Sequence, residues 1–296
     1  IISPSTESRT LKELTQQLDD DLYYRLVGTE DSWAVPQGIF LHRQGYRKLA
    51  LAYNQVDHVS TLYALLVGDA FSDEGGELVD VPFTHTDADI VNGAEVLSRI
   101  DQPGGPDAIL LSSLVPGAVL VFQASLTYQW THIPAPHWEF MTGFSVNDFA
   151  EQVGSTTALE GKGGFESMAL NDALAQAFRY QFEQAMGRSP DSSYVDKVYD
   201  AIYLVAAASF LATDLGDGRS IRDGVRQLSA GDVLSGGQWT QMQEALRLEG
   251  QMDYDGVSGN CDFDQYGEVT TNVRRWTFVN GQVHRETENN CFQRDL

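Results

Sequence analysis

Four short apolar runs that alternate with amphipathic segments constrain the fold of this chain more than any other feature. The apolar runs cover residues 48–53, 77–83, 107–112 and 139–144. The segments between them show helical spacing of apolar residues over 60–72, 89–100 and 115–127. Continuous apolar runs are typical of strands that are buried on both faces, and intervening helices join such strands in parallel. The sequence therefore predicts an α/β fold built on a parallel sheet.

The loops that follow these strands are the first places to look for a binding site. Open parallel sheets bind their ligands at the carboxyl ends of the strands. The loops at that edge are predicted to span residues 54–60, 84–89, 112–117 and 142–148. We therefore expect ligand contacts from these four segments.

The second half of the chain is richer in predicted helix. Helical spacing covers residues 169–187, 194–213 and 220–228. Near the end, Asn280-Gly281 separates two strand-like pieces within residues 274–283. An Asn-Gly pair between alternating apolar residues is a strong signal for a β-hairpin. We expect helices to dominate the second half and a hairpin to follow them.

Length and charge narrow the class of protein. The chain has 296 residues, 42% of them apolar, which is enough for two lobes with cores of their own. Its formal net charge of -23 argues against partners with phosphate backbones, such as nucleic acid, and against anionic membrane surfaces. No apolar run approaches the roughly 18 residues that a membrane-spanning helix needs. A water-soluble protein without nucleic-acid or membrane partners is expected.

The two cysteines, Cys261 and Cys291, allow two interpretations. A sparse, even count fits one disulfide in an oxidising compartment, whereas a reducing compartment would leave two free thiols. Both residues lie in the same C-terminal segment and flank the expected strand pair. This placement favours the disulfide.

Two acidic or histidine-containing patterns could suggest a metal site. Asp262 and Asp264 begin an arrangement like a calcium loop, but the fifth and twelfth positions, where an EF-hand has oxygen ligands, are Tyr266 and Val273. His132 and His137 flank a proline-rich stretch with Glu139 beyond it, and no helix or hairpin brings them together. We predict no metal and no cofactor.

No pattern of residues makes a positive case for catalysis. The stretch Gly256-Val-Ser-Gly259 lacks the glycine spacing of a nucleophile elbow and precedes a strand, where the elbow precedes a helix. Cysteine and histidine do not occur at the spacing of a nucleophile and its base. The chain is predicted not to be an enzyme.

Six short motifs occur in the order and at the approximate spacing found in one known family. They are Ile2–Ser8 (ISPSTES), Tyr24-Arg25 with Thr29–Ser32, Arg47–Gly76, Pro106–Leu111, Tyr199–Ala208 (YDAIYLVAAA) and Tyr254–Glu268 (YDGVSGNCDFDQYGE). Together they resemble the type I periplasmic solute-binding proteins, the family of branched-chain amino acid receptors. The resemblance runs from one end of the chain to the other.

The resemblance implies two Rossmann-like lobes with parallel sheets. Residues 1–32 and 165–249 would form a partial N-terminal lobe, and residues 33–164 and 250–296 the C-terminal lobe. The N-terminal lobe is expected to be partial. In the family, the residues that precede the "SPgAT" turn build most of the sheet of this lobe, and they have no counterpart in this sequence.

The family also implies a set of ligand contacts. The positions that match its motifs are Ser5, Thr6, Glu7 and Ser8 on the turn of the N-terminal lobe, and His58, Leu114 and Phe144 in the other lobe. Three of these depart from the family's pattern, because Glu7 replaces a threonine, His58 replaces a tyrosine and Phe144 replaces an acid. The sequence therefore predicts a ligand more apolar than a standard α-amino acid, with Trp33 and Tyr53 as further apolar contacts.

The function implied by the resemblance is capture of a small solute for uptake. The chain would bind an amino acid or a related organic molecule between its lobes and deliver it to the permease of an ABC transporter. It would lie in the periplasm or outside the cell, where a lipid anchor could hold it. The alternative is an envelope scaffolding, regulatory or sensory module of the same fold that contacts a protein partner.

Overall fold

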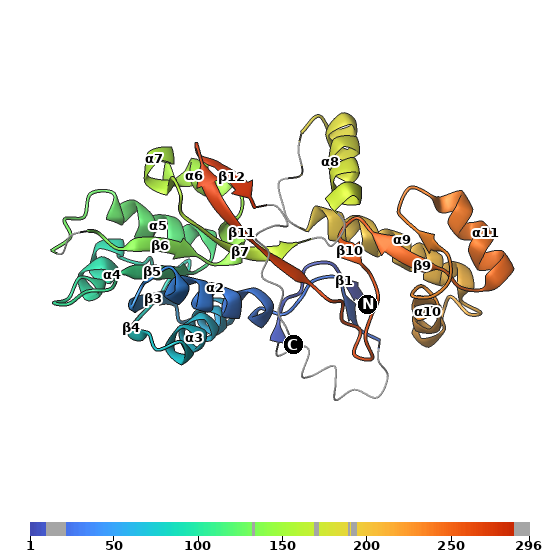
Figure 1. The fold of residues 1–296 in the computed structure, drawn as a ribbon, viewed down its shortest axis with the longest axis horizontal. Helices are drawn as coiled ribbons and strands as arrows, with labels where there is room; N and C mark the ends of the chain where they lie inside the picture. The colour runs from blue at the N-terminus through green and yellow to red at the C-terminus, as the bar shows by residue number, and fades with distance from the viewer. Residues whose placement is uncertain (10–21, 132–133, 169–171, 189, 191–193, 287–296) are drawn as a thin grey trace. The chain divides into compact units, whose positions relative to one another are not determined.

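A computed structural model of the chain describes residues 1–9, 22–131, 134–168, 172–188, 190 and 194–286 (Figure 1). The chain forms two compact units and crosses between them three times. Unit 1 comprises Ile1–Glu30 and Ser167–Asn272, and unit 2 comprises Asp31–Glu166 and Val273–Leu296.

The first two crossings fall after residues 30 and 166, and the third falls after residue 272. Residues 250–272 belong to unit 1, whereas the sequence placed them in the C-terminal lobe. The reason is that β9 (Asp253–Gly256) pairs with β8 (Val233–Leu234) and with β10 (Gly259–Asn260). The side chain of Asp200 in unit 1 also accepts hydrogen bonds from residues 254, 257 and 258.

Unit 2 is built on a seven-stranded sheet with the order β12-β11-β7-β6-β5-β3-β4. In chain order the strands are β3 (Lys48–Asn54), β4 (Glu77–Phe83), β5 (Ala108–Ser112), β6 (His137–Phe140), β7 (Gly163–Met168), β11 (Asn272–Val279) and β12 (Gln282–Arg285). β3 pairs in parallel with β4 and β5, and the parallel pairing continues to β6 and β7. The predicted α/β fold with a parallel sheet is confirmed.

The sequence explains the central strands and the hairpin. Every residue of β5 is buried, as is β3 beyond its first residue, because helices cover both faces of a parallel sheet. β11 and β12 pair antiparallel on either side of Asn280 and Gly281. These two residues have φ angles of 52° and 76°, the left-handed conformation that a tight hairpin turn requires.

Helices from the described part of unit 2 pack around this sheet (Figure 1). They are α2 (Asp31–Arg43), α3 (His58–Asp73), α4 (Gly93–Ile100), α5 (Val115–Ser125), α6 (Asn147–Val153) and α7 (Thr156–Leu159). α3 begins where the carboxylate of Asp57 accepts a hydrogen bond from the Ser60 amide, 3.2 Å away. α4 begins four residues later than the periodicity predicts, because Asn92 caps it. The preceding residues form a turn in which the Thr86 hydroxyl oxygen accepts hydrogen bonds from the amides of Ala88 and Asp89.

The predicted strand over residues 139–144 was wrong in its limits. β6 starts at His137 and ends at Phe140, and a 3-10 turn, η1, covers Thr142–Phe144. The ring of Phe144 stacks on Phe149 with centroids 4.7 Å apart and meets Phe140 edge to face. Phe140, Phe144 and Phe149 are therefore part of the core of unit 2, although only Phe140 belongs to β6.

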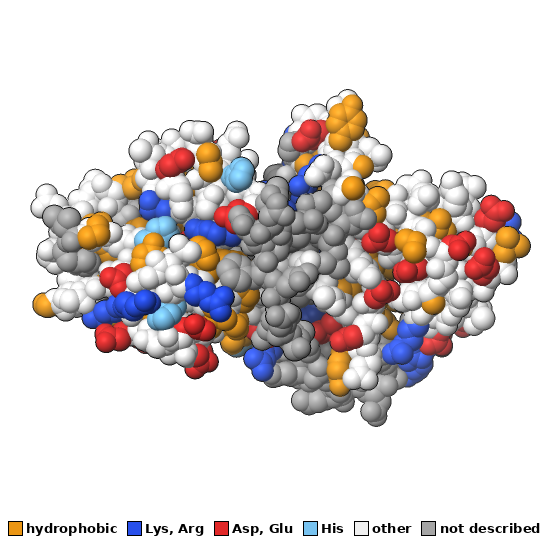
Figure 2. All heavy atoms as spheres, in the orientation of Figure 1, with side chains coloured by type: hydrophobic (Ala, Val, Ile, Leu, Met, Phe, Trp, Pro, Cys, Tyr) orange, Lys and Arg blue, Asp and Glu red, His pale blue; other side chains and the backbone are white. Residues whose placement is uncertain are grey.

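The described residues of unit 1 form small sheets and longer helices. The parallel pair β1 (Ile2–Ser3) and β2 (Tyr24–Arg25) forms one sheet, and β8, β9 and β10 form another. The helices are α8 (Asp172–Met186), α9 (Val195–Leu211), α10 (Gly218–Val225) and α11 (Trp239–Glu249). α9, α10 and α11 pack with β9 around a core that includes Leu204, Met242 and Tyr254. Figure 2 shows many acidic side chains on the visible face of this unit.

The described part of the chain contains no helix that is both long and apolar enough to cross a membrane.

Candidate functional site

The carboxyl edge of the sheet in unit 2 brings polar side chains from three strands together. β3, β4 and β5 run parallel, so Asn54, His85 and Ser113 all follow or end their strands at this edge. Asn54 is buried and clamps the loop after β4: its Nδ2 donates to the His85 carbonyl at 3.0 Å, and its Oδ1 accepts from the His85 amide at 3.1 Å. The clamp fixes the position of the His85 backbone relative to β3.

Two consecutive serines at the end of β5 differ in their hydrogen bonding. Ser112 Oγ donates to the Ser60 carbonyl at 2.8 Å, which ties the strand to the first turn of α3. Ser113 is 1% exposed, and its Oγ has no hydrogen-bond partner among the described residues. Buried hydroxyls are nearly always hydrogen-bonded in folded proteins. The Ser113 hydroxyl is therefore a polar group whose partner the described part of the chain does not supply.

Gly117 lies in the first turn of α5, directly beside this hydroxyl. A Cβ atom on Gly117 would lie only 2.7 Å from Ser113 Oγ and 3.0 Å from Cδ2 of His85. Only glycine therefore lets the helix turn approach the hydroxyl and the imidazole this closely. The amides of a helix N-terminus attract negatively charged groups. The combination suits one oxygen of a carboxylate.

An ion-pair cluster around a buried carboxylate joins β7, β11 and β12. Glu166 is fully buried and accepts from Arg274 Nε at 2.9 Å and from Arg285 Nε at 2.6 Å, while Arg285 Nη2 also donates to the Ser145 carbonyl. Burial alone would raise the pKa of Glu166, but the two guanidinium groups outweigh it, and the pKa lies below its ordinary value. The cluster holds β7, β11 and β12 together at this edge.

A second buried network joins α2 to the sheet. Glu139 Oε1 accepts from Arg275 Nη2 at 2.7 Å and lies 3.0 Å from His137 Nε2. Glu139 Oε2 accepts a hydrogen bond from Gln37 Nε2 at 3.2 Å. The side-chain oxygen of Gln37, Oε1, in turn accepts from the Tyr63 hydroxyl at 2.6 Å. Because every member of this network contacts another protein group, we interpret it as structural.

In unit 1 the turn after β1 is held by a buried arginine. Arg25 is 1% exposed and donates from Nη1 to the Ser8 carbonyl at 3.0 Å and to the Thr6 carbonyl at 3.4 Å. Glu268 forms an ion pair with the same guanidinium. Within the turn, the Thr6 amide donates to Ser3 Oγ at 3.1 Å. The turn is thus fixed by contacts with β2 and with the segment around residue 268.

The residues predicted on this turn have different surroundings. Ser5 is exposed, whereas Thr6 and Ser8 are half-buried and contribute carbonyls to the contacts of Arg25. The carboxylate of Glu7 accepts a hydrogen bond from the Tyr194 hydroxyl, and its carbonyl accepts one from the Glu30 amide at 3.2 Å. Glu7 thereby links the turn to the start of α9.

The residues predicted in unit 2 do not share one surface. His58 is exposed at the start of α3, and Leu114, 59% exposed, precedes α5 at the carboxyl edge. Phe144, by contrast, is 0% exposed and packs within the aromatic core. Trp33 and Tyr53 are buried as well. Of the predicted apolar contacts only Leu114 is exposed, and the role of these residues in ligand binding stays a prediction.

The patterns considered as metal sites have structural roles where the structure describes them. Asp264 Oδ1 accepts from the amides of Tyr266 at 2.7 Å and Glu268 at 3.0 Å, so this carboxylate shapes a turn. His132 lies outside the described residues. Among the residues that are described, no group of three or more histidine, cysteine or acidic side chains could hold a metal ion.

Cys261 is buried and forms no disulfide among the described residues, and burial raises the pKa of its thiol well above the usual value. Cys291 lies outside the described residues. The pairing of the two cysteines stays a prediction.

Comparison with known proteins rests on structure alone, because no family model and no curated protein matches the sequence. The leucine-binding protein LivK from Thermotoga maritima superposes with a TM-score of 0.73 at 17% identity, over 99% of this chain and 73% of that one. LivJ from Streptococcus pneumoniae, a branched-chain amino acid transporter substrate-binding protein solved with isoleucine, gives a TM-score of 0.68 at 18% identity, over 96% and 72%. This chain has the type I periplasmic-binding-protein fold. A solute-binding protein from R. palustris in complex with 4-hydroxybenzoate shares it, with a TM-score of 0.71 at 13% identity over 99% and 71% of the two chains.

Sequence reasoning located the edge of this type I fold but missed its main polar groups. The loop at 112–117 was predicted to contact ligand, yet Ser113 and Gly117 were not singled out within it. The sequence did contain a signal for them. Two serines follow an apolar run, and a glycine lies in the next helical turn, whereas a site with only a packing role would favour larger apolar residues. The partnerless state of Ser113, however, depends on neighbours that only the fold supplies.

Proposed function

We propose that this chain is a solute-binding protein that captures a small organic ligand for uptake by an ABC-type transporter. In this proposal units 1 and 2 act as the two lobes, and the carboxyl edge of the sheet in unit 2 binds the ligand. The chain performs no chemistry on the ligand. The observation that carries the proposal is the type I fold over nearly the whole chain, together with a buried, partnerless hydroxyl at the sheet edge where such folds bind ligands.

The surroundings of Ser113 favour a ligand with a carboxylate. One carboxylate oxygen would accept a hydrogen bond from the Ser113 hydroxyl beside the N-terminus of α5, where backbone amides favour negative charge. Leu114 would contact an apolar part of the same molecule, since its side chain is exposed next to the serine. A small organic acid or an amino acid has both features.

The cellular setting follows from the same proposal. A receptor of this kind works outside the cytoplasm and hands its ligand to a permease, so we propose the periplasm or the cell exterior, with a lipid anchor as one means of attachment. The acidic surface, with a net charge of -23, suits a protein that is freely exposed to solvent.

The test is a thermal-shift screen with amino acids, amides, short peptides and aromatic acids. A ligand at 100 times its Kd stabilises the folded state by about 2.7 kcal/mol. For a protein of this size that corresponds to a rise in Tm of roughly 5–10 °C. The variant Ser113→Ala should reduce the shift, whereas Ser98→Ala on the exposed face of α4 should not. If no compound in the panel shifts the Tm of the wild-type protein, the proposal fails.

A further inference from the structure

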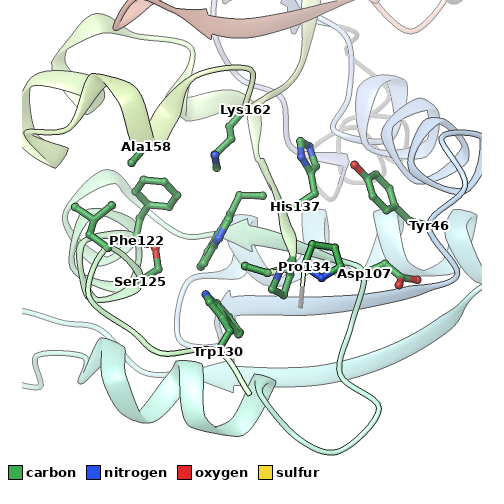
Figure 3. A pocket seen from close by; sticks show the side chains of 13 residues that line it. Tyr46, Asp107, Phe122, Ser125, Trp130, Pro134, His137, Ala158 and Lys162 are labelled. Carbon is green, nitrogen blue, oxygen red and sulfur yellow. Dashed lines mark hydrogen bonds between the residues drawn. The ribbon is translucent and has the colours of Figure 1, made fainter. Parts of the chain in front are cut away.

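A hollow of about 600 Å³ lies at the opposite edge of the sheet in unit 2 (Figure 3). Tyr46 precedes β3, Asp107 precedes β5, His137 begins β6 and Lys162 precedes β7, so all four stand at the amino ends of parallel strands. The carboxyl-edge site proposed above lies at the other ends of these strands. The two places therefore do not share residues.

Aromatic rings form the walls of this hollow. Phe122 and Trp138 are nearly fully buried and meet edge to face with centroids 5.2 Å apart, which makes a rigid wall. On another side the His137 ring stacks on Tyr46 at 5.4 Å, with an angle of 12° between the planes. Trp130 closes a third side (Figure 3). Flat apolar walls of this kind favour a planar aromatic molecule.

Among the described residues that line the hollow, Lys162 is the only lysine or arginine. Its backbone is fixed on both sides, because its amide donates to the Leu159 carbonyl at 2.9 Å and its carbonyl accepts from the Phe278 amide at 2.8 Å. The side chain is half-buried and extends into the hollow (Figure 3). Within the described part of the chain, its ammonium group makes no hydrogen bond or ion pair.

The missing counter-ion has a measurable consequence. Burial lowers the pKa of Lys162, because the charged form loses water and gains no compensating partner from the described residues. Asp107 also lines the hollow, but its carboxylate accepts hydrogen bonds from the Arg47 amide at 2.7 Å and the Lys48 amide at 3.0 Å and forms no ion pair with Lys162. An anion that enters the hollow would supply the missing counter-charge.

We propose that this hollow is a second ligand site, which binds a small planar aromatic carboxylate. The ring lies between Trp130 and the stacked pair of His137 and Tyr46, and the carboxylate pairs with the ammonium group of Lys162. The site is independent of the proposed transport function, since it is built only from the amino edge of one unit. Ligand binding there is expected to persist when the carboxyl edge is altered.

The test uses 2-naphthoate as the probe and isothermal titration calorimetry on the full chain. Lys162→Gln should weaken binding at least about 10-fold, because a charge-assisted contact contributes roughly 1.5–3 kcal/mol. Trp130→Ala should also weaken it, and the neutral analogue 2-naphthamide should bind more weakly than the acid. Circular dichroism checks that each variant is folded.

Two control variants distinguish binding in this hollow from a general charge effect and from binding at the carboxyl edge. Lys48→Gln removes the same charge at the same edge, from a lysine whose ammonium group contacts the Gly104 carbonyl and which does not line the hollow. Ser113→Ala alters the carboxyl edge only. Both should leave the affinity within about 2-fold, a change below 0.5 kcal/mol. No binding to the wild-type protein, equal losses for Lys48→Gln and Lys162→Gln, or a loss with Ser113→Ala alone would each overturn the proposal.

Discussion

Replacing Asp200 on α9 should destabilise unit 1 more than any surface change, because this carboxylate orients the turn between β9 and β10. It accepts from the Tyr254 hydroxyl at 2.8 Å, the Val257 amide at 3.0 Å and the Ser258 amide at 2.7 Å. Tyr254 and Val257 are almost completely buried, so water cannot replace the carboxylate there. With about 1–3 kcal/mol for each stranded buried donor, Asp200→Ala should cost roughly 2–6 kcal/mol.

The isosteric variant Asp200→Asn should cost less, and its cost should depend on pH. The amide oxygen can still accept from Tyr254 and Val257, and only the Ser258 amide then faces a second donor, so we expect about 1–3 kcal/mol. Burial raises the pKa of Asp200, and the hydrogen bonds from Ser258, Tyr254 and Val257 oppose that rise only in part. The contribution of Asp200 to stability is therefore fully present below pH 3.8, the ordinary pKa, and is lost as the pH rises through the folded-state pKa. The difference in unfolding free energy between wild type and Asp200→Asn should shrink over the same range.

Urea denaturation followed by 19F NMR of 5-fluorotryptophan can assign the effect to unit 1. Trp239 is the one tryptophan of unit 1, and the other four lie in unit 2. We expect the transition of the Trp239 resonance to move to lower urea in Asp200→Ala. Asp232→Asn, an exposed acid in the same unit, is the matched control and should change stability by less than about 0.5 kcal/mol. If both variants shift the Trp239 transition equally, the role assigned to Asp200 is wrong.

Two further changes test the carboxyl edge of unit 2. Glu166→Gln leaves the buried guanidinium group of Arg274 and the half-buried one of Arg285 without their counter-charge and should lower the unfolding free energy by about 3–5 kcal/mol. Because the pKa of Glu166 lies below its ordinary value of 4.5, the wild-type protein loses this stability as the pH falls through the folded-state pKa, and urea titrations at several pH values should show a flatter acid limb in the variant. Gly117→Ala favours helix by about 0.5–1 kcal/mol but overpacks the gap near residues 85 and 113 at a cost of about 1–3 kcal/mol. The net cost is therefore about 0–2.5 kcal/mol, so the Tm should stay the same or fall modestly. The affinity for the best compound of the thermal-shift screen should fall as well, and an unchanged affinity would contradict a ligand beside Gly117.

Local sequence patterns predicted the sheet well because burial acts directly on each strand. A strand covered on both faces must be apolar along its buried length, and residues 49–53 and 108–111 are. The Asn280-Gly281 turn was readable for a similar reason, since few other pairs adopt two positive φ angles without strain. These features need no knowledge of distant residues.

The exposure of the predicted ligand contacts could not be read from the sequence, because side-chain exposure depends on tertiary packing. Phe144 and Leu114 were assigned the same role from matching motif positions. The first is buried against Phe149, whereas the second is exposed beside α5. The residue type alone does not show whether an apolar side chain packs into the core or is exposed to a ligand.

The sequence by itself determined the fold class, the parallel sheet, the hairpin and the edge of the sheet at which a ligand is expected. Only the tertiary structure decided which groups lack partners, because that property depends on residues far apart in the chain. Among the described residues Ser113 has no partner, whereas Asp200 is satisfied by a segment more than fifty residues away. Lys162 likewise faces a hollow whose walls come from separate stretches of chain. Apolar periodicity is encoded locally, but hydrogen-bond and charge compensation are settled only when those stretches meet.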